Sequence, residues 1–172
     1  MKLNLGCGTS KIDGFVNVDI DSSLSPDQCW DFRRDFPLEK DSVDMIVMYH
    51  VIEHIEKKFH YDLLREVQRV LVSEGVFIVS FPEFLKCVEN WKSNKNGQRD
   101  FWEATLYGRQ LSDPDYHVCI MDSDLFKLHL VRHGFEILST HSEPGQDFNT
   151  VIKCKKVPFL TYEGVIRQVV GF

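Results

Sequence analysis

Long apolar runs are missing from this 172-residue sequence, and no hydrophobic stretch approaches the ~20 residues of a membrane-spanning helix. The chain begins almost at once with a strand pattern instead of the charged and apolar regions of a signal peptide. Cysteines are few and scattered, five in number and without a Cys-x-x-Cys pair, which favours reduced thiols over a disulfide framework or a zinc site. These absences predict a cytoplasmic protein without membrane contact.

An excess of positive charge is missing as well. The 20 Lys and Arg residues face 26 Asp and Glu residues, and the net charge of -6 argues against binding to nucleic-acid phosphates. Hydrophobic residues at 43% and charged residues at 27% are ordinary values for a globular protein. We therefore expect residues 1–172 to form a single domain with a substantial core.

Short apolar runs alternate with helical patterns along the chain. Several of these runs are continuous rather than alternating, as in strands that are covered on both faces. The alternation predicts an α/β fold, a Rossmann-like, doubly wound and mostly parallel sheet in three αβα layers. The last two strands follow the final helix with only a loop between them, which predicts an antiparallel C-terminal hairpin at one edge. The predicted strands are Lys2–Leu5, Phe15–Ile20, Val43–Tyr49, Gly75–Phe81, Phe135–His141 and Thr150–Cys154, and the predicted helices are Lys57–Val72 and Ser123–Arg132.

Two of only ten glycines follow the first predicted strand, in the sequence Gly6-Cys7-Gly8. Glycines at such a strand end leave the backbone open to a ligand, and Asp19 at the end of the next strand can hold the two hydroxyls of a ribose. This pattern favours a cofactor that contains adenosine. Only about ten residues separate Gly8 from Asp19, too few for the usual helix plus turns. We therefore expect a reduced set of helices at the N-terminal end.

Residues 83–119 interrupt the regular pattern. Aromatic side chains lie there among Asn, Lys, Gly and Asp, with a weak helical pattern only at the start. An insertion after a central strand overhangs the sheet edge where ligands bind in open α/β folds, which predicts a lid. The aromatic residues can also pack on the sheet as a small satellite core, and the two interpretations are compatible. These residues are Trp91, Phe101, Trp102, Tyr107 and Tyr116.

Five segments carry a resemblance to one enzyme family. They are LNLGCG (3–8), NVDI (17–20), WDFRRDFPLEKDSVDMIVMYHVIEHI (30–55), LLREVQRVLVSEGVFIVSFP (63–82) and LFKLHLVRHGFEIL (125–138). In this order they resemble the class I S-adenosylmethionine-dependent methyltransferases, in the short bacterial and phage form with the LNLGCG motif. The resemblance implies S-adenosyl-L-methionine as the cofactor, S-adenosyl-L-homocysteine as its product, and methyl transfer by in-line displacement.

The resemblance also implies roles for individual residues. Gly6 and Gly8 would line the methionine part of the cofactor, and Asp19 would bind the ribose hydroxyls. Asp31 would accept a hydrogen bond from the adenine amino group, with Phe32 beside the ring. The implied cofactor contacts are Leu5, Gly6, Cys7, Gly8, Asp19, Ile20, Asp31, Phe32, Tyr49 and His50.

Two histidines are the catalytic candidates. The resemblance places Tyr49 and His50 where they face the sulfonium and the acceptor. His117 lies in a segment where similar proteins carry a histidine near the acceptor pocket. It can take a proton from a hydroxyl or an amine, because the unperturbed pKa of histidine lies near neutrality. The alternative for His117 is a structural or exposed position.

The segment His50-Val51-Ile52-Glu53-His54 matches the HxxEH signature of zinc peptidases, in which two histidines one helical turn apart hold the metal. That function needs a helix at this place and a third ligand in a larger chain. Here the pentapeptide follows a predicted strand, so we expect no metal. We interpret Glu53 and His54 as residues that cap and hydrogen-bond around the loop. Zinc hydrolysis is the less favoured alternative.

The absence of certain tetrapeptide motifs near the strand ends helps to predict the class of methyl acceptor. No NPPY-like or DPPY-like tetrapeptide is present, which argues against amino methylation of DNA bases, and the acidic charge agrees. We expect a small-molecule acceptor at O or N, with a sugar or sugar-linked metabolite suggested by family-level analogy. One alternative is a non-catalytic partner subunit that binds the cofactor. A nicotinamide-dependent oxidoreductase is less favoured, since GCGTS lacks the third glycine of GxGxxG.

Overall fold

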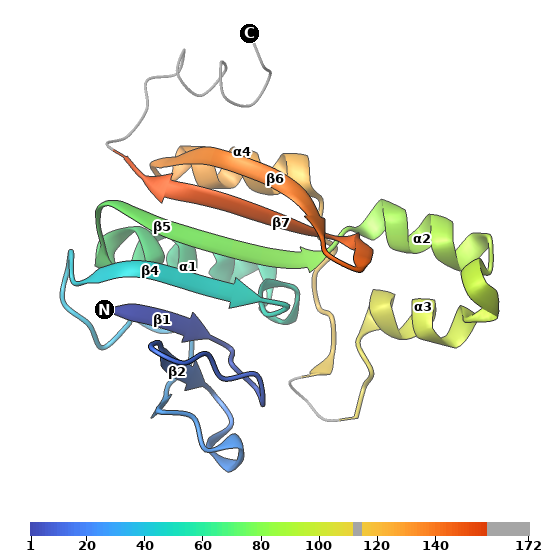
Figure 1. Cartoon of the computed structure of the whole chain (residues 1–172), viewed down its shortest axis with the longest axis horizontal. Coiled ribbons are helices and arrows are strands. Elements are labelled where there is room, and N and C mark those ends of the chain that lie inside the picture. The colour runs from blue at the N-terminus through green and yellow to red at the C-terminus, as the bar shows by residue number, and fades with distance from the viewer. Residues whose placement is uncertain (112–114, 158–172) are drawn as a thin grey trace, which may run out of the picture.

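The computed structural model describes residues 1–111 and 115–157 and is built on a seven-stranded sheet with the order β3-β2-β1-β4-β5-β7-β6 (Figure 1). The five neighbouring strands β3, β2, β1, β4 and β5 pair in parallel, whereas β7 runs antiparallel to both β5 and β6. The predicted Rossmann-like, mostly parallel sheet is thereby confirmed, including the antiparallel hairpin at one edge. The strands are β1 (Lys2–Leu5), β2 (Val16–Asp19), β3 (Gln28–Cys29), β4 (Val43–Tyr49), β5 (Leu71–Pro82), β6 (Phe135–Glu143) and β7 (Gln146–Lys156).

Two α-helices flank the sheet, α1 (Lys57–Val70) and α4 (Ser123–Arg132), and both lie on the same face (Figure 1). Between β1 and β2 the described chain forms no helix, and only the short 3₁₀ turn η1 (Ser22–Leu24) follows β2. The N-terminal helix complement is therefore reduced, as expected, and the second helical layer is not formed among the described residues. No helix in residues 1–111 and 115–157 is both long and apolar enough to cross a membrane.

The hydrophobic core fills the space between the sheet and these two helices. Leu63 and Val67 stand one helical turn apart on α1 and are buried against Ile46 of β4 and Phe77 of β5. Helix α1 is two residues shorter than predicted, because β5 begins directly at Leu71. This packing fixes α1, and with it the start of the helix after the β4 loop, against the sheet.

The carboxyl ends of β1, β2 and β4 meet at one edge of the sheet, because these strands are parallel. Leu5 is paired with Val18, so Gly6 and Asp19 follow their strands side by side. Strand β4 ends at Tyr49, on the other side of β1. The fold therefore brings the predicted cofactor motifs to one place.

The insertion 83–119 is more regular than predicted. It contains α2 (Phe84–Lys92), the short turn η3 (Lys95–Gly97) and α3 (Arg99–Tyr107), and Figure 1 shows both helices beyond the carboxyl ends of β4 and β5. Cys87 of α2 and Trp102 of α3 are buried together against Phe148 of β7 in a small satellite core, but Trp102 alone of the five aromatic residues predicted for it is buried. The expectation of little periodic structure was wrong, because the contact that stabilises α3 comes from a strand far along the chain. Residues 112–114 of this insertion lie outside the described residues.

Candidate active site

A cleft of about 420 Å³ opens at the sheet edge where β1, β2 and β4 end. A volume of this size is typical of small-molecule sites. Six of the ten predicted cofactor contacts line it, namely Gly6, Asp19, Ile20, Asp31, Phe32 and His50.

The glycine loop forms the floor of this cleft. Gly6 has φ +69°, and a Cβ atom at this position would lie 2.2 Å from Cγ2 of Val51. The Gly6 N–H donates a 2.8 Å hydrogen bond to the Val18 carbonyl, which ties the loop to β2. Only glycine combines this backbone angle with this close approach to the loop after β4.

The Asp19 carboxylate is held in an orientation in which it can bind two neighbouring hydroxyls. Its Oδ2 accepts a 2.8 Å hydrogen bond from the Gly8 N–H, and its Oδ1 accepts one of 3.0 Å from the Asp21 N–H. An ionised carboxylate offers about four acceptor positions, so each oxygen keeps one for a ligand. The donors orient the carboxylate toward the cleft, and the set fits the ribose of an adenosine cofactor. Gly8 is not on the cleft wall and acts through Asp19.

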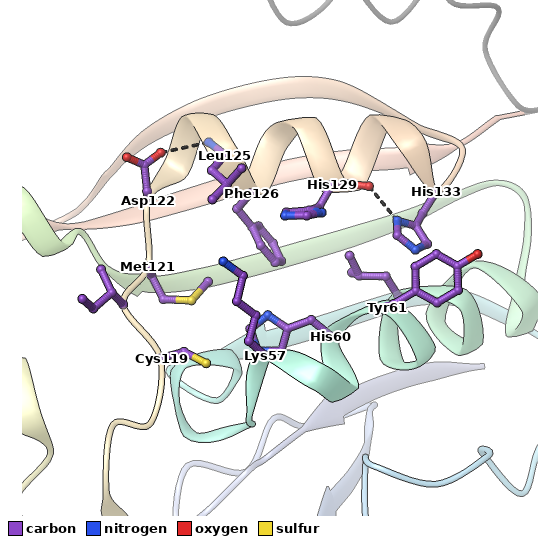
Figure 2. Close-up of a pocket in the computed structure, with 12 residues that line it drawn as sticks. Lys57, His60, Tyr61, Cys119, Met121, Asp122, Leu125, Phe126, His129 and His133 are labelled. Carbon is purple, nitrogen blue, oxygen red and sulfur yellow. Dashed lines mark hydrogen bonds between the residues drawn. The ribbon is translucent and has the colours of Figure 1, made fainter.

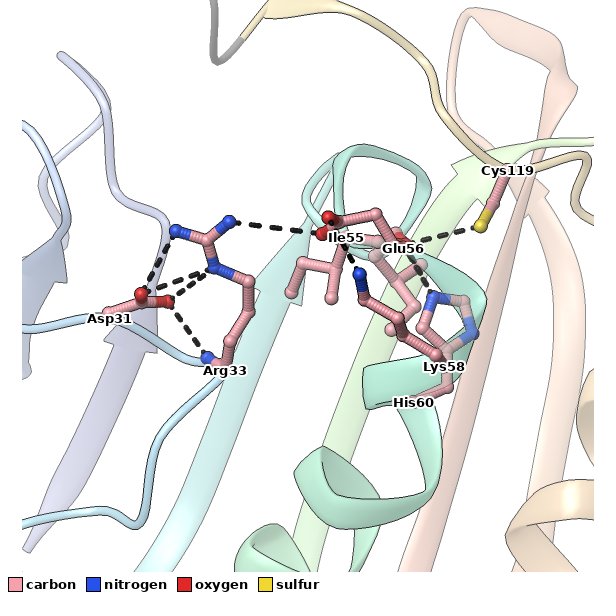
Figure 3. A network of polar contacts seen from close by, with 8 residues as sticks. Asp31, Arg33, Ile55, Glu56, Lys58, His60 and Cys119 are labelled. Carbon is pink, nitrogen blue, oxygen red and sulfur yellow. Dashed lines mark hydrogen bonds and ion pairs between the residues drawn. The ribbon is translucent and has the colours of Figure 1, made fainter.

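Asp31 and Phe32 form the side of the cleft near β3. Asp31 makes a bidentate ion pair with Arg33, in which the Arg33 Nε–Oδ1 and Nη2–Oδ2 distances are 2.9 and 3.0 Å (Figure 3). Hydrogen bonding from Arg33 lowers the pKa of the Asp31 carboxyl and outweighs its partial burial. The carboxylate therefore stays ionised and can accept from an amino group. Phe32 is buried with 6% of its surface exposed.

Besides Gly8, three predicted contacts are not among the cleft-lining residues. Leu5 is fully buried in the core, and Cys7 is 3% exposed with a thiol pKa that burial raises. Tyr49 is half-exposed at the end of β4, and burial followed by the nearby Glu143 carboxylate raises the pKa of its hydroxyl. The contacts of these three residues with a cofactor stay predictions.

His50 lines the cleft between two carboxylates. Its Nε2 lies 2.9 Å from Oε2 of Glu143, and its Nδ1 lies 3.7 Å from Oε1 of Glu53. Burial lowers the pKa of His50, but Glu53 and Glu143 together raise it more, and the net shift is upward. The backbone of His50 has φ +56°, an uncommon angle for a residue with a Cβ. The side chain is thus held at a defined orientation at the cleft wall.

The loop after His50 fits neither the zinc-peptidase interpretation nor the interpretation of Glu53 as a capping residue. The segment consists of the end of β4 and the 3₁₀ turn η2 (Ile52–His54), so the helix that a zinc peptidase needs is absent here. Glu53 is 1% exposed, and neither of its side-chain oxygens has a hydrogen-bond partner among the described residues. The interpretation of Glu53 as a capping residue is therefore wrong. His54 lines the cleft, and its Nδ1 lies 3.0 Å from the Tyr116 carbonyl.

Side chains from three segments hold this loop in place, two through the Ile55 carbonyl and one through the Glu56 carboxylate (Figure 3). His60 Nε2 lies 2.8 Å from the Ile55 carbonyl, and Cys119 Sγ donates to the same oxygen at 3.2 Å. Arg33 reaches Glu56 at 3.8 Å while it holds Asp31. The loop is therefore anchored on both sides.

His117 lies next to His54 and is not among the cleft-lining residues. The two rings meet edge to face, with centroids 4.7 Å apart and an interplanar angle of 85°. Burial lowers the pKa of His117, although the Glu53 carboxylate opposes this shift. The structure therefore separates the two catalytic candidates, with His50 on the cleft wall and His117 behind His54.

Sequence reasoning missed several residues at this site. Glu143 approaches His50 from the C-terminal hairpin, and no local pattern could reveal a contact across 93 positions. Asp115 and Val51 line the cleft without any motif of their own. For His54 the HxxEH match was a usable signal, because it singled out a histidine that does reach the cleft.

A second cavity of about 160 Å³ lies between α1 and α4 (Figure 2). Its histidines bond to backbone carbonyls, with His60 at 2.8 Å from Ile55 and His133 Nδ1 at 2.7 Å from His129. Asp122 accepts from the Leu125 N–H at the start of α4. The residues that line it include no glycine, and its one carboxylate is engaged in this cap, so the cavity lacks the features of the cofactor cleft.

Comparisons with known proteins agree with this geometry. The family model described as a methyltransferase domain matches residues 3–79, which span β1 to most of β5. No curated protein matches the chain. Solved structures share its fold at low sequence identity.

Three of these structures illustrate the similarity. A SAM-dependent methyltransferase from Methanosarcina mazei has a TM-score of 0.67 at 15% identity and covers 91% of this chain and 92% of its own. A SAM-dependent methyltransferase from Listeria monocytogenes has a TM-score of 0.61 at 16% identity, with 91% of each chain covered. A chain from the complex of the Haloferax volcanii Trm112 methyltransferase activator with a methyltransferase has a TM-score of 0.59 at 14% identity, covering 91% and 82%.

At these identities the structures establish the fold, and the family model locates the methyltransferase segment at the β1, β2 and β4 ends. The cradle of Gly6 and Asp19 fits the adenosine part of S-adenosylmethionine. The chain therefore has the fold of S-adenosylmethionine-dependent methyltransferases, and its residues 3–79 are similar to the methyltransferase domain.

Proposed function

We propose that the protein transfers a methyl group from S-adenosylmethionine to an oxygen or nitrogen of a small molecule, with sugars and sugar-linked metabolites as the proposed class of acceptor. The observation that carries this proposal is the placement of Gly6, Asp19 and His50 on one cleft of about 420 Å³. This volume suits a cofactor and a small acceptor, and the net charge of -6 disfavours nucleic acid.

The cleft residues have separate roles in cofactor binding and in proton transfer. When bound, the cofactor supplies an electrophilic methyl group on its sulfonium. Asp19 orients the ribose, and Asp31 with Phe32 holds the adenine. His50 accepts the proton of the attacking hydroxyl or amine, while Glu143, 2.9 Å from its Nε2, stabilises the protonated ring. The protein contributes mainly alignment and exclusion of water.

Binding of S-adenosylhomocysteine, measured by calorimetry, tests the cofactor assignment. Asp19→Ala should weaken binding by about 2–3 kcal/mol, because two charge-assisted hydrogen bonds are lost. This corresponds to a Kd increase of roughly 30- to 150-fold. Asp35→Ala is the matched control, since Asp35 is exposed and lies outside the cleft. Equal affinities of folded wild-type and Asp19→Ala protein would contradict the assignment.

Turnover tests the acceptor class. The protein is incubated with methyl-labelled cofactor and a panel of nucleotide sugars, free sugars and simple amines. We expect label in a small product, and we expect His50→Ala to lower kcat with little change in cofactor affinity. Label that enters only protein or nucleic acid would contradict the small-molecule proposal.

A non-catalytic partner subunit is the second candidate. The observations that favour it are the reduced N-terminal helices and the similar fold in the Haloferax volcanii complex with a methyltransferase activator. Such a subunit would bind S-adenosylhomocysteine through Asp19 and yet transfer no label alone to any acceptor. Cofactor binding and turnover are therefore measured on the same preparation.

A further inference from the structure

Glu53 is a buried carboxylate whose oxygens lack a hydrogen-bond partner among the described residues. Its side chain is 1% exposed, its oxygens accept no hydrogen bond from the described residues, and His50 Nδ1 stays 3.7 Å away. Two other buried glutamates are satisfied. Glu66 accepts from Arg69 and from the Phe36 N–H, and Glu83 accepts from Thr150 at 3.1 Å and from the Ser123 N–H at 3.3 Å. A buried carboxylate without a hydrogen bond is unfavourable, and the long 3.7 Å contact with His50 leaves room for a second, closer cation.

Two imidazoles lie beside this carboxylate. One donor atom from each of Glu53, His54 and His117 lies within 4.8 Å of the other two. Glu53 and His117 also line a small cavity of about 20 Å³, which is enough for one water-sized occupant. One carboxylate and two imidazoles form a common donor set for first-row divalent metals.

The histidines are held in a state suited to metal binding. A backbone carbonyl can only accept, so His54 must donate from Nδ1 to the Tyr116 carbonyl, and its lone pair is on Nε2. The Glu53 carbonyl accepts from the Val118 N–H at 2.9 Å and the Cys119 N–H at 3.2 Å. These bonds fix the segment that carries His117 against the loop that carries the other two donors.

We propose that Glu53, His54 and His117 bind a divalent first-row transition-metal ion such as zinc. The ion would bind the buried Glu53 carboxylate directly and leave coordination positions free. A metal bonded at about 2.0–2.2 Å to each donor separates two donors by at most ~4.4 Å, so a small side-chain rotation closes the set. This revises the expectation of no metal, which considered the HxxEH segment without His117.

The position of the site gives the ion a role in acceptor binding. His54 belongs both to the donor set and to the cleft wall, whereas Glu53 and His117 line the separate small cavity, so a bound ion would lie next to the cleft. An acceptor hydroxyl bound there would lose its proton more readily, because a metal ion lowers the pKa of a bound hydroxyl. This role rests on the proposed function, whereas binding of the ion does not. The acceptor class that fits best is a hydroxyl compound, such as a sugar.

Metal binding is tested directly on the full chain after chelator treatment. Zinc chloride is titrated by calorimetry, and cobalt chloride is followed by visible absorption, in a Cys29→Ser background that removes the exposed thiol. We expect one ion per chain and a rise in Tm on binding. Glu53→Gln and His117→Ala should each weaken binding at least tenfold, whereas His141→Ala, at an exposed histidine, should not.

Two further measurements distinguish a wrong metal-site proposal from unfolding of the variant and from a wrong proposed function. The Tm of metal-free Glu53→Gln is compared with that of the parent, and similar values show that a loss of metal binding is not caused by unfolding. S-adenosylhomocysteine affinity should be unchanged in this variant, since Glu53 does not line the cleft. Absence of stoichiometric zinc and cobalt binding, or equal binding by parent and Glu53→Gln, overturns the metal site even if the cofactor binds. Metal binding without cofactor binding would instead refute the proposed function.

Discussion

The two sides of the cleft are constructed in different ways. On the side of β1 and β2, backbone groups of the glycine loop orient Asp19, and all of these residues lie within twenty positions of each other. On the opposite side, His50 is held by Glu143 and His54 by Tyr116, and these contacts join segments that are far apart in the chain. The cofactor side therefore depends on local sequence, and the acceptor side depends on tertiary packing.

The largest effect should come from the insertion. Trp102→Ala removes the side chain that joins α3 to Cys87 and Phe148, and a buried Trp→Ala change costs about 3–5 kcal/mol. We expect hydrogen exchange to accelerate in α2 and α3, while S-adenosylhomocysteine affinity stays within twofold. If cofactor affinity fell in proportion to the loss of stability, the two sides of the cleft would not be independent.

The reverse experiment addresses the glycine loop. Gly6→Ala places a Cβ 2.2 Å from Val51 Cγ2 at positive φ, and we expect a loss of about 2–4 kcal/mol together with loss of cofactor binding. Gly8→Ala is the control. A Cβ at this position would meet no atom within 4 Å, so the substitution should cost only about 1 kcal/mol of backbone strain. Adding Val51→Ala to Gly6→Ala should restore part of the stability in urea unfolding. Equal effects of the two glycine substitutions would refute this steric explanation.

The smallest effect concerns the connection that carries Asp31 and Phe32. Glu66 holds this connection by accepting from the Phe36 N–H, and hydrogen bonds from Arg69 lower the pKa of Glu66 despite its burial. Because its folded pKa lies below the unfolded value, the stability that Glu66 contributes is present above the unfolded pKa. It is lost as the pH falls through the folded pKa.

Glu66→Gln should therefore cost about 1.5–3 kcal/mol at neutral pH and flatten the acid limb of stability against pH. Urea unfolding between pH 3 and pH 7 measures both. An unchanged acid limb in the variant would mean that other carboxylates dominate acid unfolding.

Sequence reasoning worked where the determinants are local. The strand Val43–Tyr49 and the helix Ser123–Arg132 were predicted with their observed bounds, because hydrophobic spacing and the Asp122 cap define them. The Gly6 and Asp19 pairing followed from two adjacent strand ends.

The remaining features depend on contacts that no local pattern encodes. Helix α3 forms because Trp102 packs on Phe148, and periodicity alone does not reveal that partner. The burial of Glu53 without a hydrogen bond and its proximity to His117 likewise depend on how the segment after the insertion packs against the loop after β4. Capping was the natural interpretation of Glu53, since the sequence shows its polarity and not its burial.

The antiparallel hairpin has a consequence for the order in which the molecule folds. Strand β7 inserts between β5 and β6, and Glu143 reaches His50 from 93 positions downstream. A nascent chain that has emerged only through β5 would expose the open edge of that strand and could not complete the site. Long-range closure of this kind slows folding, so activity should appear late and together with protection of the β5 edge.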